Sequence, residues 1–194
     1  MFSNDQLKEL IEGKTIGDAF PYNTKNEQEI EAHIRRLVFR IKRIPHLQCE
    51  AEWDHFGSGY ASFVELFCWR KEDVAVRKVN TDRWEEERQG IIIDVCRLAL
   101  AAIMGEDVRY KVFRDGEEIG GAYGSLLDAP NRLRVSEHLQ PAAEQIKLAL
   151  NEFHLELLEA AAINRLLPFQ AKIPTLYRNP KDYLTMDALF YWED

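Results

Sequence analysis

The stretch that decides the fold runs from residue 90 to residue 105 and reads GIIIDVCRLALAAIMG. Between its two glycines, only Asp94 and Arg97 are charged. A segment that is apolar on both faces has to lie at the centre of a fold, because neither face can be turned to water. The segment is too short to cross a bilayer, which takes about 20 apolar residues. It therefore predicts a buried core element.

The pattern of this stretch fits either a strand or a helix. β-Branched residues fill its first half, which favours a strand, whereas residues 98–104 are rich in helix formers. Residues 105–107 resemble a short polar turn, and apolar residues alternate over residues 108–114 as in a hairpin. We interpret residues 91–104 as one long central strand, bulged near Arg97, and keep a buried helix as the alternative.

Helices are predicted on both sides of the strand region. Capping-box spacing at Ser3 and at Thr24 opens two helices, and the apolar face of the second ends before Pro45. A third helix begins at Pro141, a residue type that suits the first helical turn. Its apolar positions lie on more than one face over residues 141–163. This helix is therefore either deeply buried or broken near Asn151.

Alternating apolar residues predict a strand over residues 47–54, and residues 60–69, which are apolar on both faces, predict the return strand. Three valines mark a third strand over residues 74–79. Residues 71–73 read as a tight turn and residues 80–89 as a polar connection. Asp115 and Gly116 form a type I′ hairpin signal. The whole pattern predicts a single α+β domain over residues 1–194. Its centre would be an antiparallel meander of about six strands, with helices packed against it.

Composition and charge restrict the function classes. The chain has 194 residues, of which 46% are hydrophobic and 30% charged, as in a globular domain that needs neither metal nor disulfide to fold. A net charge of −8 argues against nucleic-acid binding and permits a basic protein partner. Three cysteines in apolar contexts predict buried free thiols in a reducing compartment. Because the N-terminus lacks a signal-peptide pattern, we expect a cytoplasmic protein without a membrane segment.

Few residues offer chemistry. Asp54 and His55 are adjacent in a strand-like context, so they point to opposite faces, and a solvated turn is the interpretation. Glu152 and Glu156 flank His154, but the histidine lies off their shared helix face, so surface charge is favoured over a metal site. The cysteines predict inert thiols, because their neighbours are apolar. We therefore predict no catalytic residue, no metal and no cofactor.

Asp94 and Arg97 need partners if their segment is buried, because an unpaired buried charge is unfavourable. An internal ion pair, with each other or with a neighbouring strand, is the first interpretation. A polar pocket is the alternative.

The connection over residues 80–89 is the best candidate for partner binding. Its tryptophan is a residue type enriched in interface hot spots, and its carboxylates would steer a basic partner by long-range attraction. The alternative is a solvated loop whose tryptophan folds back onto the sheet. The predicted partner-binding residues are Asp82, Trp84, Glu85, Glu86 and Glu87.

Two stretches resemble known proteins. The tail YLTMDALFYWED, from Tyr183 to Asp194, resembles the ending of small uncharacterised bacterial proteins of the polymorphic-toxin immunity type. Residues 91–105 are similar to the central strand of those proteins. The resemblance includes no mechanistic motif and implies no catalytic residue. It implies a protein partner, namely a basic toxin domain.

Two function classes follow. The first, which we favour, is a non-enzymatic cytoplasmic protein-binding domain of the immunity type. The second is an enzyme or small-ligand binder with a pocket between sheet and helices. A filled core with an acidic, aromatic outer patch would favour the first class. A deep polar cavity around Asp94, Arg97 or His55 would favour the second.

Overall fold

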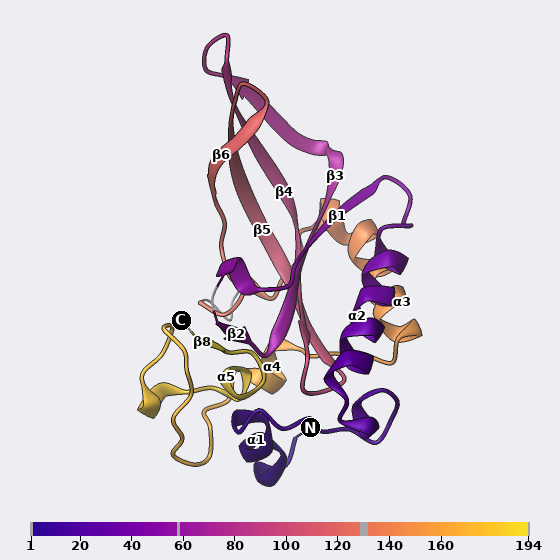
Figure 1. Cartoon of the computed structure of the whole chain (residues 1–194), viewed down its shortest axis with the longest axis vertical. Coiled ribbons are helices and arrows are strands. Elements are labelled where there is room, and N and C mark those ends of the chain that lie inside the picture. The colour runs from indigo at the N-terminus through magenta and orange to yellow at the C-terminus, as the bar shows by residue number, and fades with distance from the viewer. Residues whose placement is uncertain (1, 58, 129–131, 194) are drawn as a thin grey trace.

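A twisted antiparallel sheet forms the centre of the molecule (Figure 1). The computed structural model describes residues 2–57, 59–128 and 132–193. The main sheet has the strand order β1-β3-β4-β5-β6, and the short strand β7 pairs in parallel with β5. Its strands are β1 Leu47–Glu52, β3 Phe63–Lys78, β4 Arg83–Cys96, β5 Ala101–Arg114, β6 Glu117–Ala122 and β7 Glu156–Leu157. A separate antiparallel pair joins β2 Tyr60–Ala61 to β8 Trp192–Glu193.

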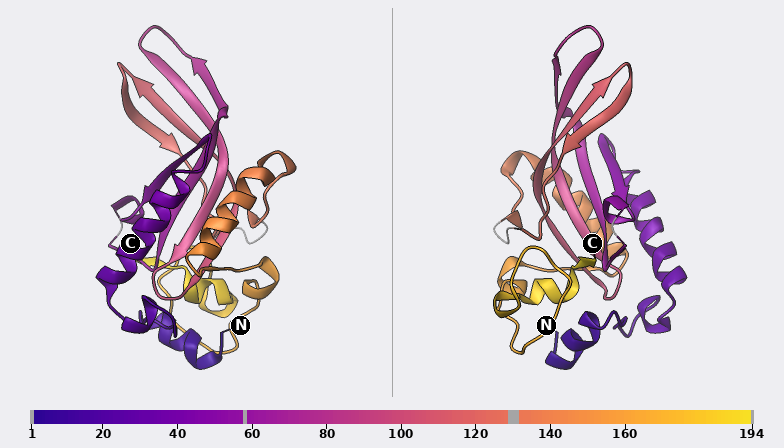
Figure 2. Two further views of the ribbon diagram at one scale, coloured as in Figure 1. Left: turned by 90° about the vertical axis from the view of Figure 1, so that its right-hand side faces the viewer. Right: turned by 60° about the vertical axis from the view of Figure 1, so that its left-hand side comes forward.

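Helices cover the lower part of both sheet faces, which confirms the predicted α+β class (Figures 1 and 2). The α-helices are α1 Asn4–Ile11, α2 Glu27–Ile41, α3 Gln140–Glu152, α4 Ala160–Ile163 and α5 Thr185–Leu189. Helices α2 and α3 pack on one face, over an apolar cluster that includes Leu66 and Ile93. Helices α1, α4 and α5, with the irregular C-terminal segment, pack on the other, over a cluster that includes Phe67 and Ile92.

The upper ends of β3, β4, β5 and β6 project beyond these helices (Figure 1). Side chains on this half of the sheet are half-buried or exposed, and every residue of β6 is exposed. The protein thus has a covered half with two apolar cores. Its projecting half consists of paired strands whose side chains are half-buried or exposed.

The prediction of one central strand over residues 91–104 is wrong. Strand β4 ends at Cys96 and β5 begins at Ala101, so the stretch forms two neighbouring strands joined by a turn at residues 97–100. Arg97 holds this turn: its backbone N–H donates to Ser62 O at 2.7 Å, and its Nη2 donates to Trp53 O at 2.7 Å. The prediction that the stretch forms the core is confirmed, because nearly all of its apolar residues are buried.

The predicted turn at residues 105–107 is wrong as well, because β5 continues through it. A Cβ atom on Gly105 would lie 2.1 Å from the carbonyl oxygen of Arg132 and 2.6 Å from Leu126 Cδ2. This glycine therefore permits a close approach of two chain segments and does not mark a turn.

Two further predicted connections are also strands. Strand β3 continues through residues 71–73, with a register shift between Trp69 and Val74 that marks a bulge. Strand β4 begins at Arg83, and residues 84–88 are paired with both β3 and β5, so this segment is not a loop.

The helix and hairpin signals were more accurate. The Ser3 capping box is present, whereas the second helix is capped by Asn26 and not by Thr24. Of the two alternatives for the third helix, the structure has the break near Asn151, because α3 ends at Glu152. Asp115 and Gly116 both have positive φ, at 52° and 89°, as a type I′ turn requires.

Candidate functional site

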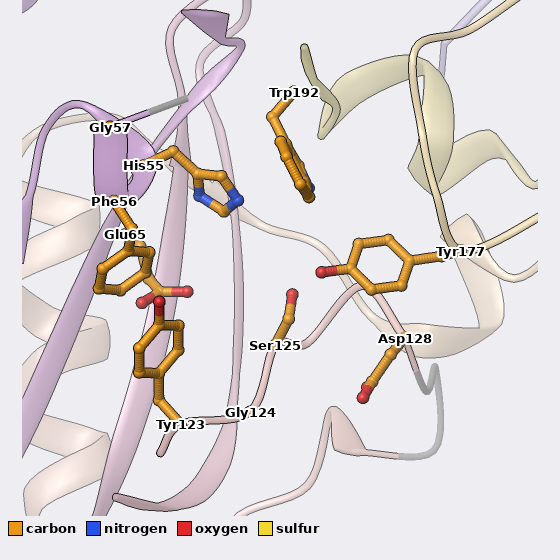
Figure 3. Close-up of a pocket in the computed structure, with 10 residues that line it drawn as sticks. All are labelled: His55, Phe56, Gly57, Glu65, Tyr123, Gly124, Ser125, Asp128, Tyr177 and Trp192. Atoms are coloured by element: carbon orange, nitrogen blue, oxygen red, sulfur yellow. The ribbon is translucent and has the colours of Figure 1, made fainter. Parts of the chain in front are cut away.

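A cavity of about 410 Å³ opens between the sheet, the loop that follows β1 and the C-terminal segment (Figure 3). Its volume lies in the range of about 300–1,000 Å³ that is typical of small-molecule sites. Figure 3 shows the His55 ring and the hydroxyl groups of Ser125 and Tyr177 directed toward one shared space. The lining combines four aromatic side chains with four polar ones: Phe56, Tyr123, Tyr177 and Trp192, and His55, Glu65, Ser125 and Asp128.

The loop after β1 places His55 and Phe56 at this cavity through an unusual backbone. Both residues have positive φ, at 43° and 57°, a conformation that costs a residue with a Cβ about 1–2 kcal/mol. The Glu52 carboxylate fixes the loop by accepting hydrogen bonds from the backbone N–H groups of Asp54 and Phe56, both at 3.2 Å. Strained residues of this kind cluster at binding and catalytic sites.

Ring contacts then fix both side chains of the loop. The His55 ring lies 4.7 Å from the Trp192 ring and 5.1 Å from the Phe63 ring, measured between centroids. Phe56 stacks on Tyr123 at 4.0 Å. The interpretation of His55 as part of a solvated turn is therefore wrong for His55, although Asp54 is exposed.

A buried ion pair forms the sheet side of the cavity. Glu65 on β3 is 2% exposed, and its Oε1 accepts a hydrogen bond from Arg109 Nη2 on β5. The Arg109 guanidinium also lies 4.2 Å from the centroid of the Phe67 ring. Burial raises the pKa of Glu65, and the charge of Arg109 opposes that shift.

Behind this pair lies Asp94, which is fully buried at 0% exposure. It stands directly opposite Glu65 in the register of β3 and β4. Neither of its carboxylate oxygens has a hydrogen-bond partner among the residues that the structure describes. Burial, and then the negative charge of Glu65, raise the pKa of Asp94 well above its ordinary value. Its surroundings therefore favour the protonated form of Asp94.

Asp107 ties the loop that carries Tyr123 and Ser125 to the sheet. Its Oδ2 accepts from the Gly124 backbone N–H at 3.0 Å, and its Oδ1 accepts from Arg132 Nη2 at 3.3 Å. Arg132 Nη1 in turn donates to Ser125 O at 3.1 Å. A Cβ on Gly124 would lie 2.5 Å from Arg132 Nη1, so a larger residue would displace the side chains of this network.

A second clamp holds the opposite wall. Arg178, the residue after Tyr177, donates from Nη1 to Asp187 Oδ1 at 2.6 Å and from Nη2 to Leu127 O at 2.8 Å. Trp192 lies on β8, which pairs with β2. Each wall of the cavity is therefore fixed by charged or backbone hydrogen bonds, and such fixed walls are typical of preformed ligand sites.

Two polar atoms of the lining lack a partner. His55 Nδ1 and Trp192 Nε1 are buried and have no hydrogen-bond partner within the described part of the chain. Burial lowers the pKa of His55, although the Glu52 carboxylate opposes that shift, so the ring is neutral at neutral pH.

The predicted partner-binding residues lie elsewhere, on the projecting half of the sheet. Trp84 is half-buried and stacks on Phe113 of β5, with centroids 5.2 Å apart. Glu85 pairs with Arg77, and Glu86 pairs with Arg88 at 2.6 Å. Glu87 and Asp82 are exposed. Partner binding by these five residues stays a prediction.

The other sequence candidates are placed as follows. The predicted internal ion pair of Asp94 and Arg97 is wrong: Arg97 donates to the carbonyl oxygens of Phe63 and Trp53, and Asp94 has no hydrogen-bond partner among the described residues. The buried ion pair close by joins Glu65 on β3 to Arg109 on β5, the strands on either side of β4. Glu152 accepts two hydrogen bonds from Arg40 of α2. The three cysteines are free and buried, as predicted, and burial raises the pKa of the Cys96 thiol to about 11. Within the described ranges, no group of three His, Cys, Asp or Glu side chains is arranged to hold a metal ion.

Sequence reasoning missed most of the cavity. The available signal was Glu65, a single carboxylate in the otherwise apolar run of residues 63–69. Tyr123, Ser125, Tyr177 and Trp192 carry no such signal, because only the fold brings them together.

Comparison with known proteins adds no relative: no protein-family model, curated protein or solved structure matches this chain. Among the helices that the structure describes, none combines the length and the apolar character needed to cross a membrane. Asp194, the last residue of the tail that resembles immunity-type proteins, lies outside the described residues.

Proposed function

We propose that this protein binds a small organic ligand in the cavity between the sheet and the C-terminal segment. The observation that carries the proposal is the pair of buried, unpartnered polar atoms, His55 Nδ1 and Trp192 Nε1, at a cavity of about 410 Å³. A buried polar atom without a partner costs about 1–3 kcal/mol. Polar atoms left unpaired at this cost call for a role other than stability, and both belong to residues that line the cavity.

The backbone of the loop supports the same proposal. His55 and Phe56 hold a conformation that L-residues rarely adopt, and the Glu52 carboxylate keeps them there. Stability alone would favour glycine at such positions. Placement of the two rings at the cavity explains why larger residues stand there.

Protein-observed NMR against a library of small molecules of mixed charge tests this function. We expect at least one class of compound to shift the side-chain signals of His55 and Trp192 in a saturable way. Trp192→Leu should abolish the ligand-induced shift of the His55 side-chain signals. Trp84→Leu, which removes a tryptophan from the projecting half, should preserve it. If no compound shifts these signals, or if Trp84→Leu removes the response equally, the cavity is not the binding site.

A second candidate function is the one that the tail resemblance implies, a bacterial cytoplasmic immunity protein that binds a basic toxin domain. Its supporting observation is the Trp84–Phe113 stack on a half of the sheet that none of the described helices covers (Figure 1). If this is the interface, charge governs encounter and Trp84 governs residence time.

Association kinetics with a candidate toxin domain test the second function. Changing Glu85, Glu86 and Glu87 together to Gln should slow association and flatten its salt dependence. Trp84→Ala should raise the dissociation rate and weaken binding by about 2 kcal/mol or more, as for a hot spot. Because these residues lie in β4, unfolding curves of both variants are a necessary control. Unchanged association and dissociation rates in both variants would exclude this surface.

A further inference from the structure

The charge around the cavity is unbalanced in favour of carboxylates. Glu65 and Asp128 line it, Asp107 holds the Gly124 loop beside it, and Glu52 holds the His55 loop. Two guanidinium groups oppose these four carboxylates: Arg109 pairs with Glu65, and Arg132 pairs with both Asp107 and Asp128. Both cations therefore already have carboxylate partners. An anionic ligand would meet excess negative charge, whereas a cation would be attracted.

Aromatic rings make up much of the remaining wall. Trp192, Tyr123, Tyr177 and Phe56 all line the cavity. Aromatic faces attract cations through their quadrupole, most strongly in the case of tryptophan, and the attraction grows when water is excluded. The Arg109 guanidinium, 5.8 Å from the Tyr123 ring, already makes such a contact at the edge of this site.

The polar groups that face the cavity add a directional requirement. Figure 3 shows the hydroxyl groups of Ser125 and Tyr177 pointing into the same space, where they are able to donate or accept.

We infer that the cavity takes a small organic ammonium ion with an acceptor oxygen close to its charge, and this inference rests on the proposed function. The ammonium group lies among the aromatic rings and the carboxylates, and the oxygen meets the hydroxyl groups of Ser125 and Tyr177. The neutral His55 ring adds no positive charge that would repel the ligand.

Three probes of similar shape and different charge test the inference by calorimetry and NMR. Choline is the cation, 3,3-dimethylbutan-1-ol is its neutral carbon isostere, and 3,3-dimethylbutanoate is an anion. We expect choline to bind about tenfold or more tightly than the neutral alcohol, as a desolvated cation–π contact requires. The anion should bind weakest of the three.

The outcomes separate this inference from the function beneath it. If the alcohol or the anion binds as tightly as choline and shifts the His55 and Trp192 signals, the cavity is a ligand site but the ammonium class is wrong. If none of the three probes binds, and the mixed-charge library also fails, both the ligand site and the inference are wrong. If the library succeeds while all three probes fail, the ammonium class alone is wrong.

Matched variants locate the charge preference within the site. Trp192→Phe keeps an aromatic face but removes the N–H donor, so it should retain the preference for choline over the alcohol. Trp192→Leu should lose that preference. Asp128→Asn, at the exposed rim, should weaken choline binding and leave the alcohol unaffected. Equal effects of Trp192→Leu on all three probes would show that the ring acts only by shape and would overturn the cation contact.

Discussion

The two faces of the central sheet are built from the same strands but hold different chemistry. Ile93 and Asp94 are neighbours on β4, and both are completely buried. Ile93 belongs to the apolar cluster beneath α2 and α3. Asp94 lies on the other face, opposite Glu65 and close to the cavity. On β3, Leu66 and Glu65 repeat the same contrast across the sheet.

This difference separates stability from ligand binding within one sheet. The face beneath α2 and α3 gains free energy from apolar burial at many positions. The opposite face gives up part of that gain by burying Glu65, Asp94, Asp107 and Arg109, because each charge or polar group must be desolvated. A buried carboxyl pair beside a cavity is a frequent feature of functional sites.

The largest expected effect is on the apolar face. Ile93→Ala should lower the free energy of unfolding by about 2–5 kcal/mol, because it removes buried methyl and methylene groups and leaves a cavity. Chemical denaturation measures this change. A loss below about 1 kcal/mol would mean that this face is not the main source of stability.

Asp94 should give a smaller effect that depends on pH. Burial and Glu65 raise its pKa, so the folded chain holds a proton that the unfolded chain releases. The contribution of this proton to the free energy of unfolding is therefore fully present below the ordinary aspartate pKa. It is lost as the pH rises through the raised pKa. The slope is at most about 1.4 kcal/mol per pH unit.

Asp94→Asn removes this titrating group and should therefore reduce the decline of the free energy of unfolding with rising pH. Urea unfolding of parent and variant over about pH 4 to pH 9 measures the difference. Asp128→Asn, which changes an exposed carboxylate, is the matched control and should follow the parent. Parallel curves for the parent and Asp94→Asn would show that Asp94 holds no proton in the folded state.

The sequence pattern predicted the fold class, but it did not show that the central stretch, residues 91–104, forms two strands joined by a turn. Turns are recognised by Gly, Pro, Asn and Asp, but the turn at residues 97–100 has none of these residues. Tertiary hydrogen bonds from Arg97 hold it instead. Gly105 resembled a turn residue, but the carbonyl group of Arg132, distant in the sequence, explains its lack of a side chain. Local sequence patterns do not show contacts between segments that are distant in the sequence.

The sequence indicated only one part of the candidate site, namely the buried carboxylates. Asp94 in an apolar run raised the question of a polar pocket, since such a group needs a partner or a proton. The answer depends on Glu65 and Arg109, which reach Asp94 only through strand pairing. The sequence neighbours of His55 predict only a solvated turn. Its positive φ and its contact with Trp192, at the far end of the chain, decide its position.

The smallest expected effect on stability lies beyond the helices, on the same face as Asp94. Trp84 stacks on Phe113 with an interplanar angle of 9°, but it remains half-buried and close to water. An aromatic pair of this kind contributes about 0.5–1.5 kcal/mol beyond its area burial. Trp84→Ala should therefore lower the free energy of unfolding by about 1 kcal/mol, less than Ile93→Ala, because neighbouring side chains and water fill the vacated space.

A double-mutant cycle with Phe113→Ala separates the stacking from the loss of area. The double variant should be more stable than the sum of the single losses predicts, by about 0.5–1.5 kcal/mol, because the stack is lost only once. Additive losses would mean that the two rings do not interact. If Trp84→Ala instead costs as much as Ile93→Ala, the projecting strands unfold together with the covered half. Trp84 would then contribute to the cooperative core of the protein, which would remove the main support for a partner-binding role at this surface.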